Sequence, residues 1–194
     1  MAWNDVQDER QAEKLNILNS SELTETIDGV DWYTYTNNSY GYQISYPENV
    51  LFERSSEMEG LLEQTEAAKK DAMIFIKDAP NEFMHTTSAV VSPDFKAFNI
   101  DELRTFYTEE SIKEHMKNNK RLNRNLKPED FTITETTYDG RQAIEVIHPI
   151  GYTIMTYNDK GTFMGVSALK YDGATTTEKD RNTKKIMETF KVLD

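Results

Sequence analysis

Alternating bulky and polar residues dominate the chain after its first thirty positions. The stretches 31–36 (DWYTYT) and 42–47 (YQISYP) both have period two, and the Asn, Ser and Gly residues between them favour a turn. Because successive strand residues point to opposite faces of a sheet, Tyr42, Ile44 and Tyr46 share one face. The pattern predicts two strands joined by a turn, with a tyrosine-rich buried face.

Three further segments have the character of strands, and polar or turn-forming residues separate them. They are 50–54 (VLFER), 72–77 (AMIFIK) and 83–91 (FMHTTSAVV). Proline has no backbone N–H to donate to a sheet, so we expect Pro93 to end the third strand. The polar stretch 61–70, between the first two strands, has helical propensity.

Residues 131–170 show the clearest architecture, because four strand-like segments follow one another with turn residues between them. The segments are 131–138, 141–148, 152–157 and 162–170. An Asp-Gly pair favours a tight hairpin turn, and a longer turn that ends in Gly suits a hairpin with one left-handed residue. The sequence predicts an antiparallel meander. Several of these strands carry apolar residues on both faces, so we expect both sides of the sheet to be covered.

Two helices are predicted. Asn99 with Glu102 three residues later is a capping-box pattern that opens a helix over 99–119. In this first helix the apolar residues lie on two opposite stripes, so it either breaks near Thr108 or packs on two sides. Thr177 is the N-cap of a second helix, over 178–193. The apolar stripe of this second helix, which we expect to lie on the sheet, consists of Thr183, Ile186, Met187 and Phe190.

The first 30 residues differ in texture from the rest of the chain. Residues 1–30 are rich in Glu, Asp, Asn, Gln and Ser, with scattered apolar positions. We interpret them as a polar tether, partly disordered or weakly helical over residues 4–18. Residues 31–194 then form a single domain.

Composition narrows the classes of function. The 194 residues include 34 Asp and Glu against 22 Lys and Arg, and the net charge is −12. Such a surface repels phosphate backbones, so nucleic acid is not expected as a partner. No run approaches the ~18 apolar residues of a membrane-spanning helix. Without cysteine, the chain has no disulfide, no thiolate metal site and no cysteine nucleophile.

Candidate catalytic residues are sparse. His85, His115 and His148 lie on three different predicted elements and lack a metal-ligand spacing such as His-Glu-x-x-His. His148 is the strongest of them, because it ends a strand beside Pro149, where it could face a pocket at the rim. The stretch GVSAL around Ser167 has half of the Gly-x-Ser-x-Gly nucleophile turn, and we place it within a strand.

Carboxylates are plentiful, but an EF-hand-like spacing of Asp or Asn with Gly is absent. The stretch YNDKG offers Asn158 and Asp159 to a cation, yet a role in the turn explains both. The tyrosines fit packing in a core, with each hydroxyl reaching a partner or water at its rim. We assign no catalytic residue and no cofactor-binding residue, expect no cofactor, and leave a metal site open.

Motifs at both ends of the domain point to a known family. Residues 35–47 read Tyr-x-x-x-x-Tyr-Gly-Tyr-x-Ile-x-Tyr-Pro, a central helix and a hairpin meander follow, and Ile-Met-Glu-Thr-Phe-Lys closes the pattern at 186–191. Over roughly residues 31–194 the chain resembles the PsbP-like superfamily, which includes Mog-like proteins and a bacterial surface-lipoprotein branch. None of the Ran-binding or photosystem-docking positions of that superfamily matches a residue here.

The resemblance implies an α+β fold, in which helices pack on the faces of a central antiparallel β-sheet to give an α/β/α-like sandwich. It also implies export to the cell surface or extracellular space, with a lipid anchor upstream and residues 1–30 as the tether. A cytoplasmic location is the alternative.

Three functions follow from these observations. The first is a non-enzymatic, exported or surface-tethered domain that mediates protein binding or assembly of an envelope complex, with another protein as its partner. The second is a small-molecule or divalent-cation binding module that uses a cleft between sheet and helix. The third is a hydrolase that uses His148 and a carboxylate.

Overall fold

The computed structural model describes most of the chain from residue 19 onwards. The described residues are 19–57, 66–77, 86–96, 101, 110, 113–114, 128–149, 151–169 and 178–193. The helix expected within residues 4–18 lies outside them, as does most of the helix expected over 99–119.

The four-stranded sheet joins the beginning of the chain to its end. Its strands are all antiparallel, and in spatial order they are β1 (Asn19–Ile27), β2 (Val30–Asn37), β3 (Tyr42–Pro47) and β11 (Lys191–Val192). The strands and the turn predicted from the alternation over 31–47 are confirmed. Residues 19–27, which we placed in the tether, form β1 and pair with β2 along their whole length.

A seven-stranded antiparallel sheet contains the remaining strands. In spatial order they are β4 (Leu51–Arg54), β5 (Met73–Lys77), β6 (Thr86–Lys96), β10 (Thr162–Leu169), β9 (Gly151–Tyr157), β8 (Arg141–His148) and β7 (Thr132–Tyr138). The predicted meander is confirmed. Its tight turn has positive φ at both central residues, 48° at Asp139 and 74° at Gly140, as a two-residue hairpin of matching twist requires.

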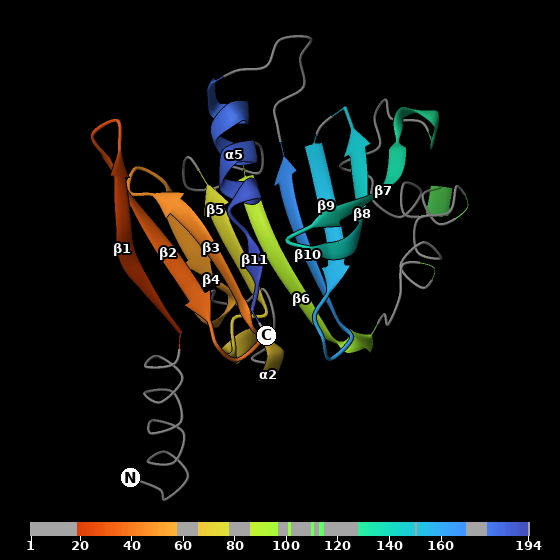
Figure 1. Ribbon diagram of the computed structural model, residues 1–194, viewed down its shortest axis with the longest axis horizontal. Helices are drawn as coiled ribbons and strands as arrows, with labels where there is room; N and C mark the ends of the chain where they lie inside the picture. Colours follow the sequence, from red (N-terminus) through yellow and green to blue (C-terminus); the bar gives the residue numbers. More distant parts are fainter. Residues whose placement is uncertain are drawn as a thin grey trace, which may run out of the picture.

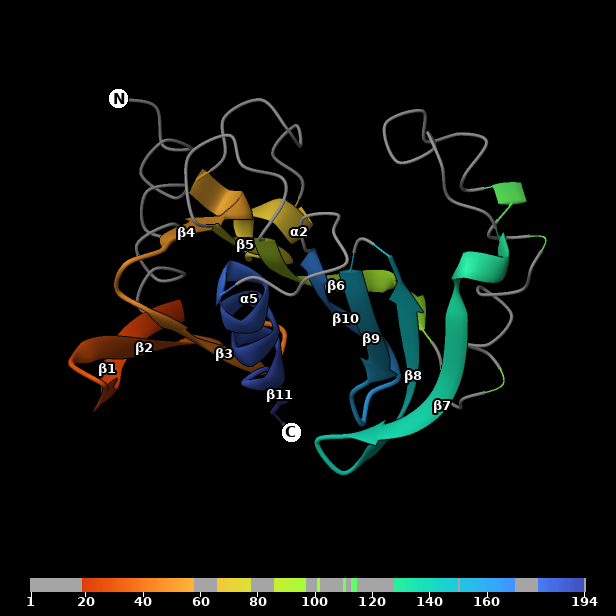
Figure 2. The same ribbon diagram turned by 90° about the horizontal axis from the view of Figure 1, so that it is seen from above.

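Helices are a minor part of the described chain. The two α-helices are α2 (Glu66–Lys69) and α5 (Glu178–Glu188), and the two 3₁₀ turns are η1 (Ser55–Glu57) and η3 (Pro128–Asp130). Figures 1 and 2 show that α5 lies between β3 of the four-stranded sheet and one face of the seven-stranded sheet. The helix contacts β10, β6 and β3.

The predicted α/β/α-like sandwich is wrong. The described strands form two antiparallel sheets instead of one central sheet with helices on its faces. A strand face that is apolar needs a cover, but a second sheet covers it as well as a helix does. Here Tyr35 and Tyr46 of the tyrosine face contact Phe52 of β4, and the larger of two core clusters draws side chains from both sheets and from α5.

A row of aromatic rings runs through this core. In order, it consists of Tyr33, Tyr46, Phe52, Tyr35, Tyr42, Phe190 and Tyr138, and neighbouring ring centroids lie 6.2, 4.5, 4.9, 6.1, 5.7 and 6.3 Å apart. These are distances at which aromatic pairs attract each other. The row links β2, β3, β4, β7 and the segment that follows α5, so it connects the two sheets.

The stripe predicted for the last helix is confirmed, because its four members are all buried. The predicted end of the helix is wrong, since α5 stops at Glu188 and β11 follows. Thr189 and Phe190 donate N–H bonds to carbonyls only three residues back, at 3.0 and 3.1 Å. This tighter turn closes the helix and directs the chain along β3.

The expectation that Pro93 ends its strand is also wrong. β6 continues to Lys96, and the pairing with β10 shifts there, because Phe163 faces Ser92 while Thr162 faces Lys96. Residues 93–95 therefore form a bulge. A bulge leaves residues unpaired, so a proline in it removes no hydrogen bond from the ladder.

The structure explains why the Tyr-Gly-Tyr motif has a glycine at position 41. Its φ is +71°, and a Cβ at this position would lie 2.6 Å from the carbonyl oxygen of Leu193. Leu193 in turn donates its N–H to the Gly41 carbonyl at 2.8 Å. The close approach of the C-terminal strand thus requires a residue without a side chain.

We expect Phe190→Ala to lower the free energy of unfolding by about 3–5 kcal/mol, because it empties a fully buried position in the aromatic row. Leu23→Ala is the matched control, since Leu23 is 58% exposed, and its effect should stay within about 0.5 kcal/mol. Urea denaturation of both variants measures the difference. Equal losses would show that the row does not hold the sheets together.

Candidate functional site

The residues considered for hydrolysis lie on separate elements. His85 and His115 fall outside the described residues. His148 ends β8, and its ring stacks on that of Phe131 with centroids 5.4 Å apart. Ser167 lies within β10, as predicted, and its hydroxyl is 3.0 Å from that of Thr153. The described geometry therefore gives the serine a threonine as its hydrogen-bond partner.

The YNDKG stretch is a turn, as predicted, and its oxygens serve that turn. The Asn158 side-chain oxygen accepts the N–H of Lys160 at 3.0 Å and that of Thr162 at 2.9 Å. Asp159 forms an ion pair with Arg141. Across the described ranges, no group of three or more acidic, histidine or cysteine side chains is placed to hold a metal ion.

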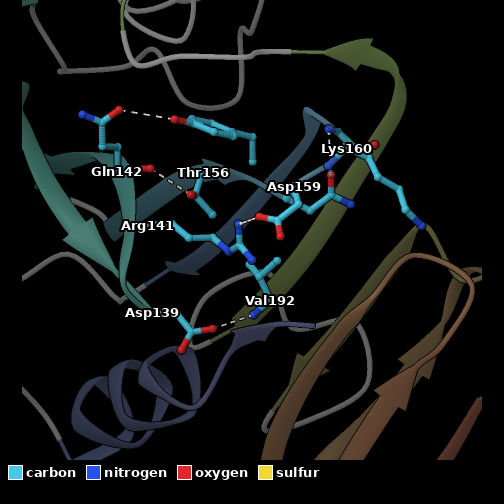
Figure 3. A network of polar contacts seen from close by, with 10 residues as sticks. Asp139, Arg141, Gln142, Thr156, Asp159, Lys160 and Val192 are labelled. Carbon is cyan, nitrogen blue, oxygen red and sulfur yellow. Dashed lines mark hydrogen bonds and ion pairs between the residues drawn. The ribbon is translucent and has the colours of Figure 1, made fainter. Parts of the chain in front are cut away.

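The ion pair between Arg141 and Asp159 belongs to a group of polar residues beside β11, shown in Figure 3. We call this group the polar rim and define it as Asp139, Arg141, Gln142, Thr156 and Asp159. The Thr156 hydroxyl donates to the Gln142 carbonyl at 2.9 Å. The Asp139 carboxylate accepts the backbone N–H of Val192 at 2.9 Å. This N–H points away from β3, because the next one, that of Leu193, points toward it. Within the rim, Asp139 therefore occupies the outward N–H of Val192 at the edge of β11.

Thr189 seals the neighbouring part of the same sheet edge. Its hydroxyl oxygen accepts the N–H of Ser45 at 2.8 Å, and lies 3.0 Å from the Ser45 carbonyl and 2.7 Å from that of Ile186. The backbone groups that β3 would offer to another strand are thus occupied by a side chain. Such blocking is a known defence against edge-to-edge aggregation.

A buried polar cluster, consisting of Tyr35, Asn37, Tyr42, Ser56 and Asp71, joins the two sheets. We call it the Asp71 cluster. Asp71 is only 2% exposed and has a φ of +55°. Its carboxylate accepts the Tyr35 hydroxyl at 2.8 Å and the Ser56 N–H at 3.1 Å.

The backbone at Asp71 is held as firmly as its side chain. The Asp71 carbonyl accepts the Tyr42 hydroxyl at 2.8 Å and the Asn37 side-chain N–H at 3.0 Å. Asn37 also donates to the Lys70 carbonyl at 2.8 Å. Both sheets are therefore tied to the loop between α2 and β5 through hydrogen bonds that are shielded from water.

Burial raises the pKa of the Tyr35 and Tyr42 hydroxyls well above their usual range, and nearby negative charge on Asp71 adds to the rise. Both phenols therefore stay protonated at any ordinary pH. Their role is to donate hydrogen bonds, which confirms that these tyrosines serve core packing. Nothing in the sequence singled out Asp71, because its partners come from strands more than 25 residues away.

β1 forms the opposite edge of the four-stranded sheet. Within the described chain no strand pairs with the outer side of β1, whose side chains from Ser21 to Thr26 are exposed. Two of them are the carboxylates of Glu22 and Glu25. We call this surface the β1 edge. A nine-residue edge strand is a template for pairing with another chain.

Comparisons with known proteins are sparse. No protein-family model matches the chain, and no curated protein matches it. Among solved structures, the chain is similar to the solution structure of cyanobacterial PsbP (CyanoP) from Synechocystis sp. PCC 6803. The two share 13% sequence identity and a TM-score of 0.49, over 83% of this chain and 92% of that chain.

This neighbour carries the name of the superfamily that the sequence motifs resemble. At such identity and TM-score, no residue role or activity transfers to the chain, and the Mog-like and lipoprotein links stay predictions. In the part of the chain that the structure describes, no helix has the length and apolar character to cross a bilayer.

Thr189→Val should lower the free energy of unfolding by about 1–3 kcal/mol, because it leaves the partly buried backbone groups of Ser45 without their partner. Thr189→Ser keeps the hydroxyl and should restore most of that stability. Chemical denaturation compares the two. If the serine variant is as unstable as the valine variant, the lost methyl contacts and not the hydrogen bonds are responsible.

Alkaline pH should lower the free energy of unfolding, because the buried hydroxyls of Tyr35 and Tyr42 stay protonated in the folded protein and ionise in the unfolded chain. The unfolded chain releases these protons from about pH 10 and the folded chain keeps them, so each of Tyr35 and Tyr42 should remove about 1.4 kcal/mol of stability per pH unit above that point. Their contribution is fully present below pH about 10.

Tyr42→Phe tests this, since it removes one phenol and leaves the bond from Tyr35 to the Asp71 carboxylate in place. Denaturation between pH 9 and 11.5 should show the same slope of stability against pH in both proteins at first, and a slope shallower in the variant by up to about 1.4 kcal/mol per pH unit once the pH exceeds about 10. An unchanged slope would mean that Tyr42 titrates normally in the folded state.

Proposed function

We propose that this chain is a non-enzymatic protein-binding domain, exported and tethered at the cell surface, where it binds another protein or assists the assembly of an envelope complex. The observation that carries the binding role is the contrast between the two edges of the four-stranded sheet. Side chains close the edge formed by β3 and β11, through Thr189 and Asp139. Among the described residues, no strand pairs with the outer side of the β1 edge.

The core supports this role by making the β1 edge rigid. Ser21 on β1 accepts the hydroxyl of Tyr46, a member of the aromatic row, at 2.9 Å. Tyr33, directly opposite Leu23 in the pairing of β1 with β2, begins the same row. A strand held in place before binding loses little conformational entropy when a partner pairs with it.

The surface location is the second part of the proposal. It is supported by the many Asp, Glu, Asn and Gln residues that precede β1, among residues 1–18, and by the resemblance to a superfamily with a surface-lipoprotein branch. A tether of this composition would hold the folded domain away from an anchor while leaving β1 accessible.

Photo-crosslinking in the cells that produce the protein tests the binding role. A photoreactive amino acid at Leu23, on β1, should yield a discrete adduct with another protein, whereas the same amino acid at Glu114, an exposed position on a different segment, should not. A membrane-impermeant label applied to intact cells should modify the chain. Absence of any adduct from Leu23 would contradict protein binding at this edge, and absence of label would contradict surface exposure.

A further inference from the structure

We infer that the β1 edge docks an extended, basic segment of the partner, which adds to the four-stranded sheet as a fifth strand. This inference rests on the proposed protein-binding function and specifies the chemistry of the partner. It follows from the direction of the backbone groups on β1, from the charge around them and from the arrangement of the side chains.

The register fixes which backbone groups on β1 point outward. Both backbone groups of Ser45 are directed away from β2, toward the hydroxyl that caps them. Its neighbour across the ladder, Thr34, therefore directs its own groups toward β1, where it faces Glu22. Because bonded and non-bonded pairs alternate in antiparallel sheets, the N–H and C=O groups of Ser21 and Leu23 point outward.

Side-chain hydroxyls hold this part of β1 in a defined position. The Thr24 hydroxyl donates to that of Thr34 at 2.6 Å, and Thr34 is 2.7 Å from the hydroxyl of Ser45. This short hydroxyl ladder crosses three strands. It stabilises β1 at its bulge, which lies between Leu23 and Glu25, and so presents the outward groups in a fixed geometry.

The negative charge around β1 favours a basic partner strand. Residues 15–53 contain no Lys or Arg. From β1 to the turn after β3 the chain carries the carboxylates Glu22, Glu25, Asp28, Asp31 and Glu48. Lys185 of α5 approaches this sheet over the ring of Trp32, with its ammonium 4.8 Å from the ring centroid. A second copy of this chain would place acidic strands side by side, whereas a basic strand gains from the same field.

The side chains of β1 predict the pattern of the partner strand. Glu22 and Glu25 face Thr34 and Trp32 across the ladder, so both lie on one face of the sheet. Leu23 lies on the other face, where it is 58% exposed. A complementary strand therefore carries basic residues on one face and apolar residues on the other, with period two.

A synthetic peptide with this pattern, acetyl-Thr-Lys-Val-Lys-Val-Lys-Thr-amide, is the probe. Fluorescence polarisation should show saturable binding to the full chain that weakens as salt is added. Amide hydrogen exchange, followed by NMR, should slow by about tenfold or more at Ser21 and Leu23 when the peptide is saturating. A peptide with Glu in place of Lys, and one N-methylated at its central residues, should both bind at least about tenfold more weakly.

Charge reversal on β1 provides the matched variants. Glu22→Lys with Glu25→Lys should weaken binding of the Lys peptide by about tenfold or more, and the neutral pair Glu22→Gln with Glu25→Gln by a smaller factor. The control, Glu114→Lys with Glu129→Lys, changes the net charge equally at exposed positions away from β1 and should stay within about twofold of the parent. The neutral pair keeps the test valid if charge reversal disturbs folding.

Four outcomes would overturn the inference: no binding of the Lys peptide, equal binding of the N-methylated peptide, protection at β7 instead of β1, or a dimer in sedimentation velocity that the β1 variants dissociate. If the peptide fails while Leu23 still crosslinks to a protein in cells, the partner chemistry is wrong and the proposed binding function stands. If both fail, the proposed function falls as well.

Discussion

The buried hydrogen bond from Tyr35 to Asp71 is the contact on which the two-sheet arrangement depends. A carboxylate taken out of water needs strong donors, and here it receives a phenol from β2 and a backbone N–H from η1. Those donors come from opposite sides of the core. The two sheets must therefore lie close enough for both donors to reach the Asp71 carboxylate. The aromatic rings fill the space between the sheets at that separation.

This constraint accounts for the tyrosines. A phenylalanine would fill the same volume, but it could not reach the Asp71 cluster, the carbonyl of Met187 or the hydroxyl of Ser21. The rings of Tyr35, Tyr42, Tyr46 and Tyr138 contribute apolar area, and each of these four hydroxyls donates a hydrogen bond. The same contacts position β1: the Tyr46 hydroxyl reaches Ser21, and Tyr33 of the aromatic row lies opposite Leu23, so the core supports the strand that we propose as the binding surface.

Local patterns allowed the strands, the Asp139-Gly140 turn and the buried stripe of α5 to be predicted, because a period of two or 3.6 residues is visible within one segment. The division into two sheets was not predicted, since it depends on which distant faces meet. β1 was missed because both of its faces are exposed and its sequence does not alternate. Asp71 had no local signal, and the β1 edge became visible only with the sheet order.

The pairing of β11 with β3 places Lys191 and Val192 against Gln43 and Tyr42, which are synthesised much earlier. Until Lys191 and Val192 leave the ribosome, Gly41 has no neighbour to approach and the ring of Tyr42 lacks its contact with Phe190. Contacts over so long a sequence separation form late and slowly. A chain that has not yet presented Lys191 and Val192 therefore lacks the contacts that close this side of the four-stranded sheet.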